Sequence, residues 1–138
     1  MKIWFGFASE HSSKIRMIGT FKNAQSASDA VRDLDRLMET AVNTFDFDKF
    51  DENPMAWYTD TEVQELLREL RLEHFSSEDL RHLVGEHRVE RAPGSNKAVV
   101  LWTDEFDLGA FVKYLIRKSA HIEIYSAHDF PERDEKIR

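Results

Sequence analysis

The chain has 138 residues, of which 41% are hydrophobic and 33% are charged. This composition supplies enough apolar side chains for one compact core, and the length is short for two ordinary domains. The 26 acidic side chains outnumber the 19 lysines and arginines, and the resulting net charge of −7 disfavours a role in binding nucleic acid. The absence of cysteine excludes disulfides, thiolate nucleophiles and cysteine-ligated metal sites.

The chain shows no signal for a membrane or for secretion. No apolar run approaches the roughly 20 residues that a membrane-spanning helix needs. The N-terminal segment is apolar only as far as Glu10 and His11, so it does not have the apolar core of a signal peptide. We therefore expect a cytoplasmic protein without a membrane partner.

The first third of the chain predicts two strands and one long helix. Apolar residues alternate over residues 2–8 and again over residues 14–21, which is the period of a half-buried strand. From Asn23, a suitable N-cap, apolar residues recur every three or four positions up to residue 45, so we expect an amphipathic helix. Residues 46–58 fit neither period and are expected to form a connection.

Two short helices are predicted next. Thr59 followed by Glu62 is a capping-box pattern and begins the first helix, which we expect to run to residue 70. Ser76 followed by Asp79 begins the second, and Gly85 is expected to provide its left-handed stop. We interpret these helices as an insertion.

The last third predicts a hairpin, a helix and a strand. Residues 86–92 and 97–102 are strand candidates joined by the turn sequence Pro-Gly-Ser-Asn. A helix is expected over residues 104–116, and residues 121–125 alternate as a final strand. We expect residues 1–131 to form a single domain and residues 132–138 to be a flexible charged tail.

The predicted element order defines the expected fold. Without the first strand and the inserted helix pair, the order is βαββαβ. We therefore expect an α+β ferredoxin-like sandwich that carries an extra N-terminal strand and an inserted helix pair.

This topology brings two polar motifs together. The last strand should end at the sheet edge where the strand of residues 14–21 begins, and the turn before that strand lies at the same edge. We expect a binding rim there, formed by Ser9, Glu10, His11, Ser12, Tyr125, Ser126, His128 and Asp129. The alternative is that these side chains merely satisfy backbone groups where the strands end.

The chain resembles a family of small uncharacterised bacterial proteins in three segments. These are MKIW with SEHS in residues 1–12, MIG with FK in residues 17–22, and EIYSAHDFP in residues 123–131. The resemblance spans nearly the whole chain. It implies a bacterial, cytosolic, single-domain protein and implies no particular reaction.

Three functions fit these observations. The first is a non-catalytic module that binds a small molecule or a protein through the rim. The second is a metal-assisted hydrolase or other enzyme, in which His11 and His128 bind a divalent metal, Asp129 is a ligand or orients an imidazole, and Glu10 is the general base. The third is an acidic antitoxin or immunity-type protein that masks a basic partner.

Self-association is also expected. The pairs Trp4 and Ile18, or Trp102 and Val100, lie on the strand faces opposite those assigned to the core. Because helices can cover one face of the sheet, we expect a second copy to cover the other and form a homodimer.

Two further groups of residues receive structural interpretations. Phe45, Phe47, Phe50 and Trp57 are expected to form a hydrophobic plug under a loop rather than an aromatic cage. Residues 65–91 mix arginine, histidine and glutamate, and helical spacings such as Glu78 to Arg81 predict a solvated surface of ion pairs.

Overall fold

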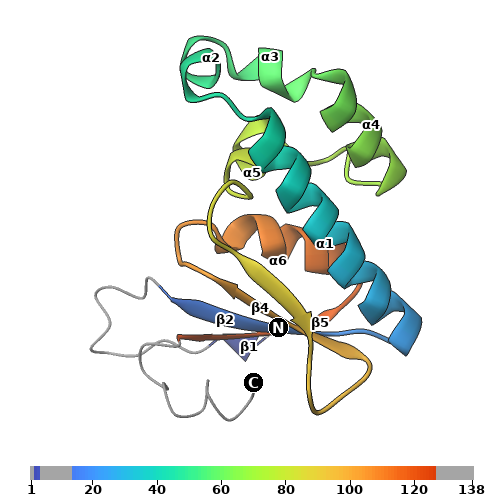
Figure 1. Ribbon diagram of the computed structural model, residues 1–138. Helices are drawn as coiled ribbons and strands as arrows, with labels where there is room; N and C mark the ends of the chain where they lie inside the picture. The colour runs from blue at the N-terminus through green and yellow to red at the C-terminus, as the bar shows by residue number, and fades with distance from the viewer. Residues whose placement is uncertain (1, 4–13, 127–138) are drawn as a thin grey trace.

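The computed structural model describes residues 2–3 and 14–126 and contains a five-stranded sheet in the order β1-β5-β2-β4-β3 (Figure 1). Within the run β5-β2-β4-β3 each pair of neighbouring strands is antiparallel, and β1 runs parallel to β5. The fold is therefore α+β with a four-stranded antiparallel unit. The strand bounds are β1 Lys2–Ile3, β2 Ile15–Thr20, β3 Arg88–Arg91, β4 Ala98–Thr103 and β5 His121–Ser126.

Six helices occur in the described part of the chain. The long helix α1 and the C-terminal helix α6 cover one face of the sheet, and α2 to α4 lie beyond α1, farther from the strands (Figure 1). Within residues 2–3 and 14–126, no helix is long and apolar enough to cross a bilayer. The bounds are α1 Ala24–Thr44, α2 Phe47–Glu52, α3 Pro54–Tyr58, α4 Thr61–Glu69, α5 Ser77–Arg81 and α6 Leu108–Arg117.

The expectation that residues 46–58 form a connection is wrong, because α2 and α3 occupy them. The predicted inserted helix pair is therefore a set of four short helices. Asp46 caps α2 by accepting from the Lys49 amide, and Asn53 caps α3 by accepting from the Met55 amide. Helices of five or six residues are too short to display apolar periodicity, so the capping residues are the local sequence signal for α2 and α3.

Helix α1 lies close to the sheet because its buried stripe includes small residues. Ala27, Ala30 and Ala41 are buried together with Leu34 and Leu37. Helix α6 approaches β2 equally closely, since a Cβ atom added at Gly19 would lie 2.8 Å from a Leu115 methyl carbon. These contacts fix the position of α6 and of the turn that precedes it.

The expectation that Gly85 stops the second short helix is wrong. Helix α5 ends at Arg81, before Gly85. The left-handed positions after α4 and α6 are instead Arg71 and Ser119, both with a φ of 60°. Each is stabilised by a hydrogen bond that closes the last turn, for example from the Leu72 amide to the Leu67 carbonyl, 2.7 Å away.

The sheet face opposite α1 and α6 carries a row of arginine and aromatic side chains. Arg16 pairs in register with Trp102 on one side and Tyr125 on the other, and Trp102 pairs with Arg88. The Arg88 guanidinium carbon lies 3.9 Å from the Trp102 ring centroid, and that of Arg16 lies 5.3 Å from the Tyr125 centroid. One cation–π contact therefore joins β3 to β4, and the other joins β2 to β5.

Candidate functional site

Only part of the expected rim lies within the described residues. Tyr125 and Ser126 end β5, and Ser126 pairs with Ile15 at the edge where β2 begins. The Tyr125 hydroxyl donates to the Glu123 carboxylate. The remaining rim residues lie outside the described residues, so the rim stays a prediction; they are Ser9, Glu10, His11, Ser12, His128 and Asp129.

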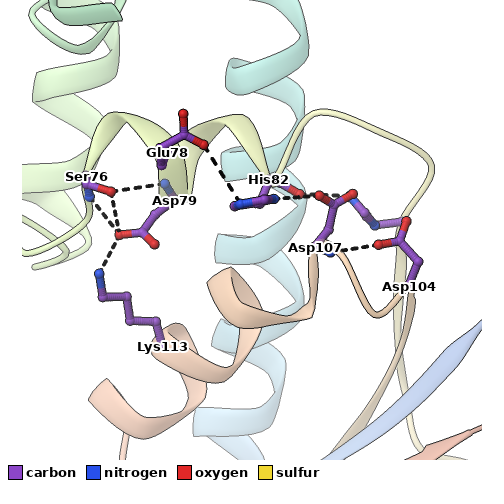
Figure 2. Close-up of polar contacts among 8 residues, drawn as sticks. Ser76, Glu78, Asp79, His82, Asp104, Asp107 and Lys113 are labelled. Carbon is purple, nitrogen blue, oxygen red and sulfur yellow. Dashed lines mark hydrogen bonds and ion pairs between the residues drawn. The ribbon is translucent and has the colours of Figure 1, made fainter. Parts of the chain in front are cut away.

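A different polar cluster connects α5 to the start of α6 (Figure 2). We call it the His–Asp network, and it consists of His82, His87, Thr103 and Asp107. His82 Nδ1 lies 2.7 Å from one oxygen of Asp107, and His87 Nε2 lies 3.4 Å from the other. Asp107 occupies the N-cap position of α6, but its carboxylate accepts no hydrogen bond from the helix backbone. Both of its oxygens are directed to histidines instead.

The contacts of His87 define the direction of the hydrogen bonds. Its side chain is completely buried, and Nε2 lies 3.0 Å from the His82 carbonyl oxygen, so Nε2 carries the proton. Nδ1 then accepts from the Thr103 hydroxyl, 3.0 Å away. His87 is thus a structural histidine with a hydrogen-bond partner at each ring nitrogen.

His82 is the more accessible imidazole of the network. Its Nδ1–H donates to Asp107, and its Nε2 lies 4.0 Å from a Glu78 carboxylate oxygen. Its side chain is 23% exposed. Asp107 therefore holds the orientation of a partly exposed imidazole ring.

A second contact holds α5 against α6. Asp79 accepts from Lys113 Nζ of α6, and it forms a reciprocal capping box with Ser76 at the start of α5. Burial opposes ionisation of Asp79, but the hydrogen bonds from Lys113 and Ser76 outweigh it and lower the pKa of this carboxyl. The ionised form of Asp79 therefore stabilises the fold.

We expect the substitution Asp79→Asn to lower the free energy of unfolding by about 1–2 kcal/mol at pH 7. Because folding lowers the pKa of Asp79, its contribution is present above the unfolded pKa and is lost as the pH falls through the folded value. The difference between variant and wild type should thus narrow below about pH 4. Urea unfolding at pH 7 and pH 3 measures both quantities. The neighbouring Glu78→Gln change should cost much less, since Glu78 is 63% exposed.

Beside the His–Asp network lies a small depression that we call the aromatic hollow. Its volume is about 160 Å³, and it is lined by Phe45, Phe47, Arg81, Val84, Phe106 and Asp107. Phe47 is 63% exposed and Phe106 is 67% exposed, although both are large apolar side chains. The Phe106 ring lies edge-on to His82 at 5.0 Å and beneath the Arg81 guanidinium at 5.6 Å. The hollow therefore combines two exposed aromatic rings with the charged side chains of Arg81 and Asp107.

The expected hydrophobic plug is confirmed for three of its four residues. Phe50 and Trp57 are buried, and Phe45 packs against both rings. The Trp57 indole N–H donates to the Thr44 hydroxyl at 2.8 Å. Phe47 differs because its ring contacts only the edge of this cluster, at Phe45, and remains exposed.

Sequence reasoning did not identify the His–Asp network. It placed His82 and His87 in a solvated ion-pair surface and expected Glu78 to contact Arg81. In the structure Glu78 approaches His82, and Arg81 lies over Phe106. The sequence signal for the network is Asp107, which local spacing alone indicates only as the start of a helix.

Across residues 2–3 and 14–126, no group of three or more histidine, aspartate or glutamate side chains converges as a metal site. The chain belongs to a family of unknown function (DUF6375), whose family model matches residues 1–136. No curated protein and no solved structure matches the chain.

Proposed function

We propose that the protein is a non-catalytic binding module that recognises a basic protein partner through the aromatic hollow and the acidic helices beside it. The exposure of Phe47 and Phe106 on one hollow is the observation that carries this proposal. Exposed aromatic side chains that border a concave surface are typical anchors of protein interfaces. Arg81, which lies over Phe106, adds a second residue type that is enriched at such contacts.

The charge around the hollow supports a basic partner. Between Asp46 and Glu69, eight of the ten charged side chains are acidic, and all eight are exposed. This segment contains α2, α3 and α4 and begins next to Phe47. A concentrated negative surface attracts a positively charged partner and speeds its association. An immunity-type or antitoxin role is one form of this function.

The geometry of His82 favours binding over acid–base catalysis. Its Nε2 faces the Glu78 carboxylate, and within the described part of the chain no hydroxyl nucleophile is placed against it. Asp107 and His87 complete their hydrogen bonds within the protein. The network therefore serves to hold the hollow in shape, since Asp107 forms part of its lining.

We expect a leucine- and lysine-rich amphipathic peptide to bind the protein, and the double substitution Phe47→Ser with Phe106→Ser to weaken that binding at least tenfold. The leucines supply apolar side chains for the hollow and the lysines complement the acidic helices. Isothermal calorimetry at low and high salt measures the affinity, which should fall as salt screens the charges.

The controls separate the apolar contribution from the charge. The substitution Val42→Ser removes another exposed apolar side chain, 51% accessible, which does not line the hollow, and it should leave the affinity unchanged. A peptide with glutamate in place of lysine should not bind. Equal binding of the two peptides, or unchanged affinity of the double variant, would contradict the proposal.

The strand arrangement supports the ferredoxin-like topology, which we propose for the unit without β1. The order β5-β2-β4-β3 with antiparallel neighbours is the order that two interleaved βαβ units produce. Helices α1 and α6 supply the two crossovers on one face (Figure 1). Bacterial origin and a cytosolic location also belong to the proposal, on the basis of the sequence resemblance.

We also propose a homodimer. A hollow of about 550 Å³ lies on the sheet face opposite α1 and α6, and its accessible lining includes Ile18 of β2 together with Ala92 and Pro93 of the hairpin. An apolar face of this kind can be covered by a second copy. Light scattering at micromolar concentration should give about twice the monomer mass of 16.2 kDa. A mass of one chain would rule out a tight dimer.

A further inference from the structure

A second hollow lies between the loop after α4 and the last turns of α6. We call it the basic hollow; its volume is about 420 Å³, and it is lined by Glu73, His74, Lys113, Ile116 and Arg117. We propose that the basic hollow binds a small molecule with an oxyanion head, either phosphate or carboxylate, and an apolar body. This site is independent of the aromatic hollow and of the protein partner proposed for it.

The charge of α6 sets this surface apart from the rest of the acidic chain. Residues 108–118 include Lys113, Arg117 and Lys118 and contain no acidic side chain. Lys113 forms an ion pair with Asp79, and Lys118 Nζ donates to the Leu70 carbonyl at 2.9 Å. Arg117 therefore supplies the main positive charge that the hollow can offer to a ligand.

Arg117 is held in an orientation suited to an oxyanion. Its Nε–H donates to the carbonyl of Arg71, 3.3 Å away, at the left-handed residue that ends α4. This bond uses one of the five guanidinium donors, and its two Nη groups have no protein partner among residues 2–3 and 14–126. A planar fork with two adjacent donors can bind phosphate or carboxylate in a bidentate manner.

The remaining lining residues define the body of the ligand. Ile116 is 59% exposed and supplies an apolar wall, and the His74 ring can stack on a flat ligand. The volume falls in the range of small-molecule sites, so an oxyanion alone would leave the hollow partly filled. Glu73 on the same lining repels polyanions, which favours a ligand with a single anionic group.

Phenyl phosphate is the probe that tests this proposal, with binding followed by amide chemical shifts in a heteronuclear NMR titration. We expect saturable shifts at residues 73–74 and 113–117, with a dissociation constant of about 1 mM. Inorganic phosphate should bind about tenfold more weakly, because it makes no contact with Ile116. Benzoate distinguishes a carboxylate head from a phosphate head, and saturable binding of either supports the site.

Variants link the binding to Arg117. We expect Arg117→Gln to weaken phenyl phosphate binding about tenfold and Arg117→Lys to retain part of the affinity, because lysine keeps the charge but loses the fork. The control Arg32→Gln changes an exposed α1 arginine that already contacts Asp29, and it should have no effect. Thermal unfolding verifies that each variant is folded.

Three results would overturn the proposal. The first is that neither phenyl phosphate nor benzoate shifts residues 73–74 and 113–117. The second is that phenol produces the same saturable shifts, which would remove the role of the oxyanion. The third is that folded Arg117→Gln protein binds phenyl phosphate as well as the wild type.

Discussion

The substitution Trp57→Ala should lower the free energy of unfolding by about 3–5 kcal/mol. Trp57 is only 5% exposed, and its ring packs edge-to-face with Phe45 and Phe50 at centroid distances of 4.9 and 5.8 Å. Alanine removes the whole indole and opens a cavity. The short helices α2 and α3 must then either collapse into this cavity or lose their packing contacts. Phe47 extends from the same aromatic cluster, so the aromatic hollow should lose its shape as well.

Two control variants divide this cost into its parts. Thr44→Val removes only the hydroxyl that accepts from the indole N–H at 2.8 Å, and it should cost about 1 kcal/mol. Trp57→Phe keeps much of the apolar contact, so its loss in free energy of unfolding should lie between those of Thr44→Val and Trp57→Ala. Chemical denaturation measures all three. A Trp57→Ala protein as stable as the Thr44→Val protein would show that α2 and α3 add little to the core.

The elements that the sequence predicted well are those long enough to display a period. Helix α1 runs over 21 residues with its apolar side chains on one stripe, and Asn23 caps it as expected. Strands β2 and β5 were equally predictable because their apolar residues alternate. Strand β4, in which five of six residues are buried, is indicated instead by the turn sequence that precedes it. Helices α2 and α3 were not, since their fold depends on the caps at Asp46 and Asn53 and on contacts with distant rings.

In the candidate site, too, local features were predictable from the sequence and long-range contacts were not. The capping box of Ser76 with Asp79 was predictable from local spacing, and the structure contains it. The pairing of His82 with Asp107 was not, because the two residues are separated by the whole hairpin of β3 and β4. Only the docking of α5 against α6 brings them together. Long-range side-chain pairs of this kind carry no periodic signal in a single sequence.

The substitution Asp107→Ala should lower the free energy of unfolding by about 2–4 kcal/mol. Asp107 is one of the few buried charged residues, and its carboxylate is the acceptor for His82 Nδ1 at 2.7 Å. Without it, the Nδ1–H of His82 loses its partner, and the fully buried His87 keeps only the carbonyl of His82 for its Nε2–H. Chemical denaturation at pH 7 measures the loss.

The variant Asp107→Asn tests whether both side-chain oxygens of Asp107 must be hydrogen-bond acceptors. An asparagine keeps the shape and one oxygen, which can still accept from His82, but its amide NH₂ then faces the Nε2–H of His87, donor against donor. We therefore expect Asp107→Asn to lower the free energy of unfolding by about 1–3 kcal/mol, although asparagine and aspartate are similar in size. The substitution His87→Ala should lower it less in the Asp107→Asn protein than in the wild type. The nearby Asp104→Asn change should cost less than about 1 kcal/mol, because an amide oxygen can still accept from the Asp107 backbone N–H at 2.7 Å. An Asp107→Asn protein with wild-type stability would show that the 3.4 Å contact between His87 Nε2 and this carboxylate contributes little, and that the hydrogen bond from His82 accounts for the effect of Asp107→Ala.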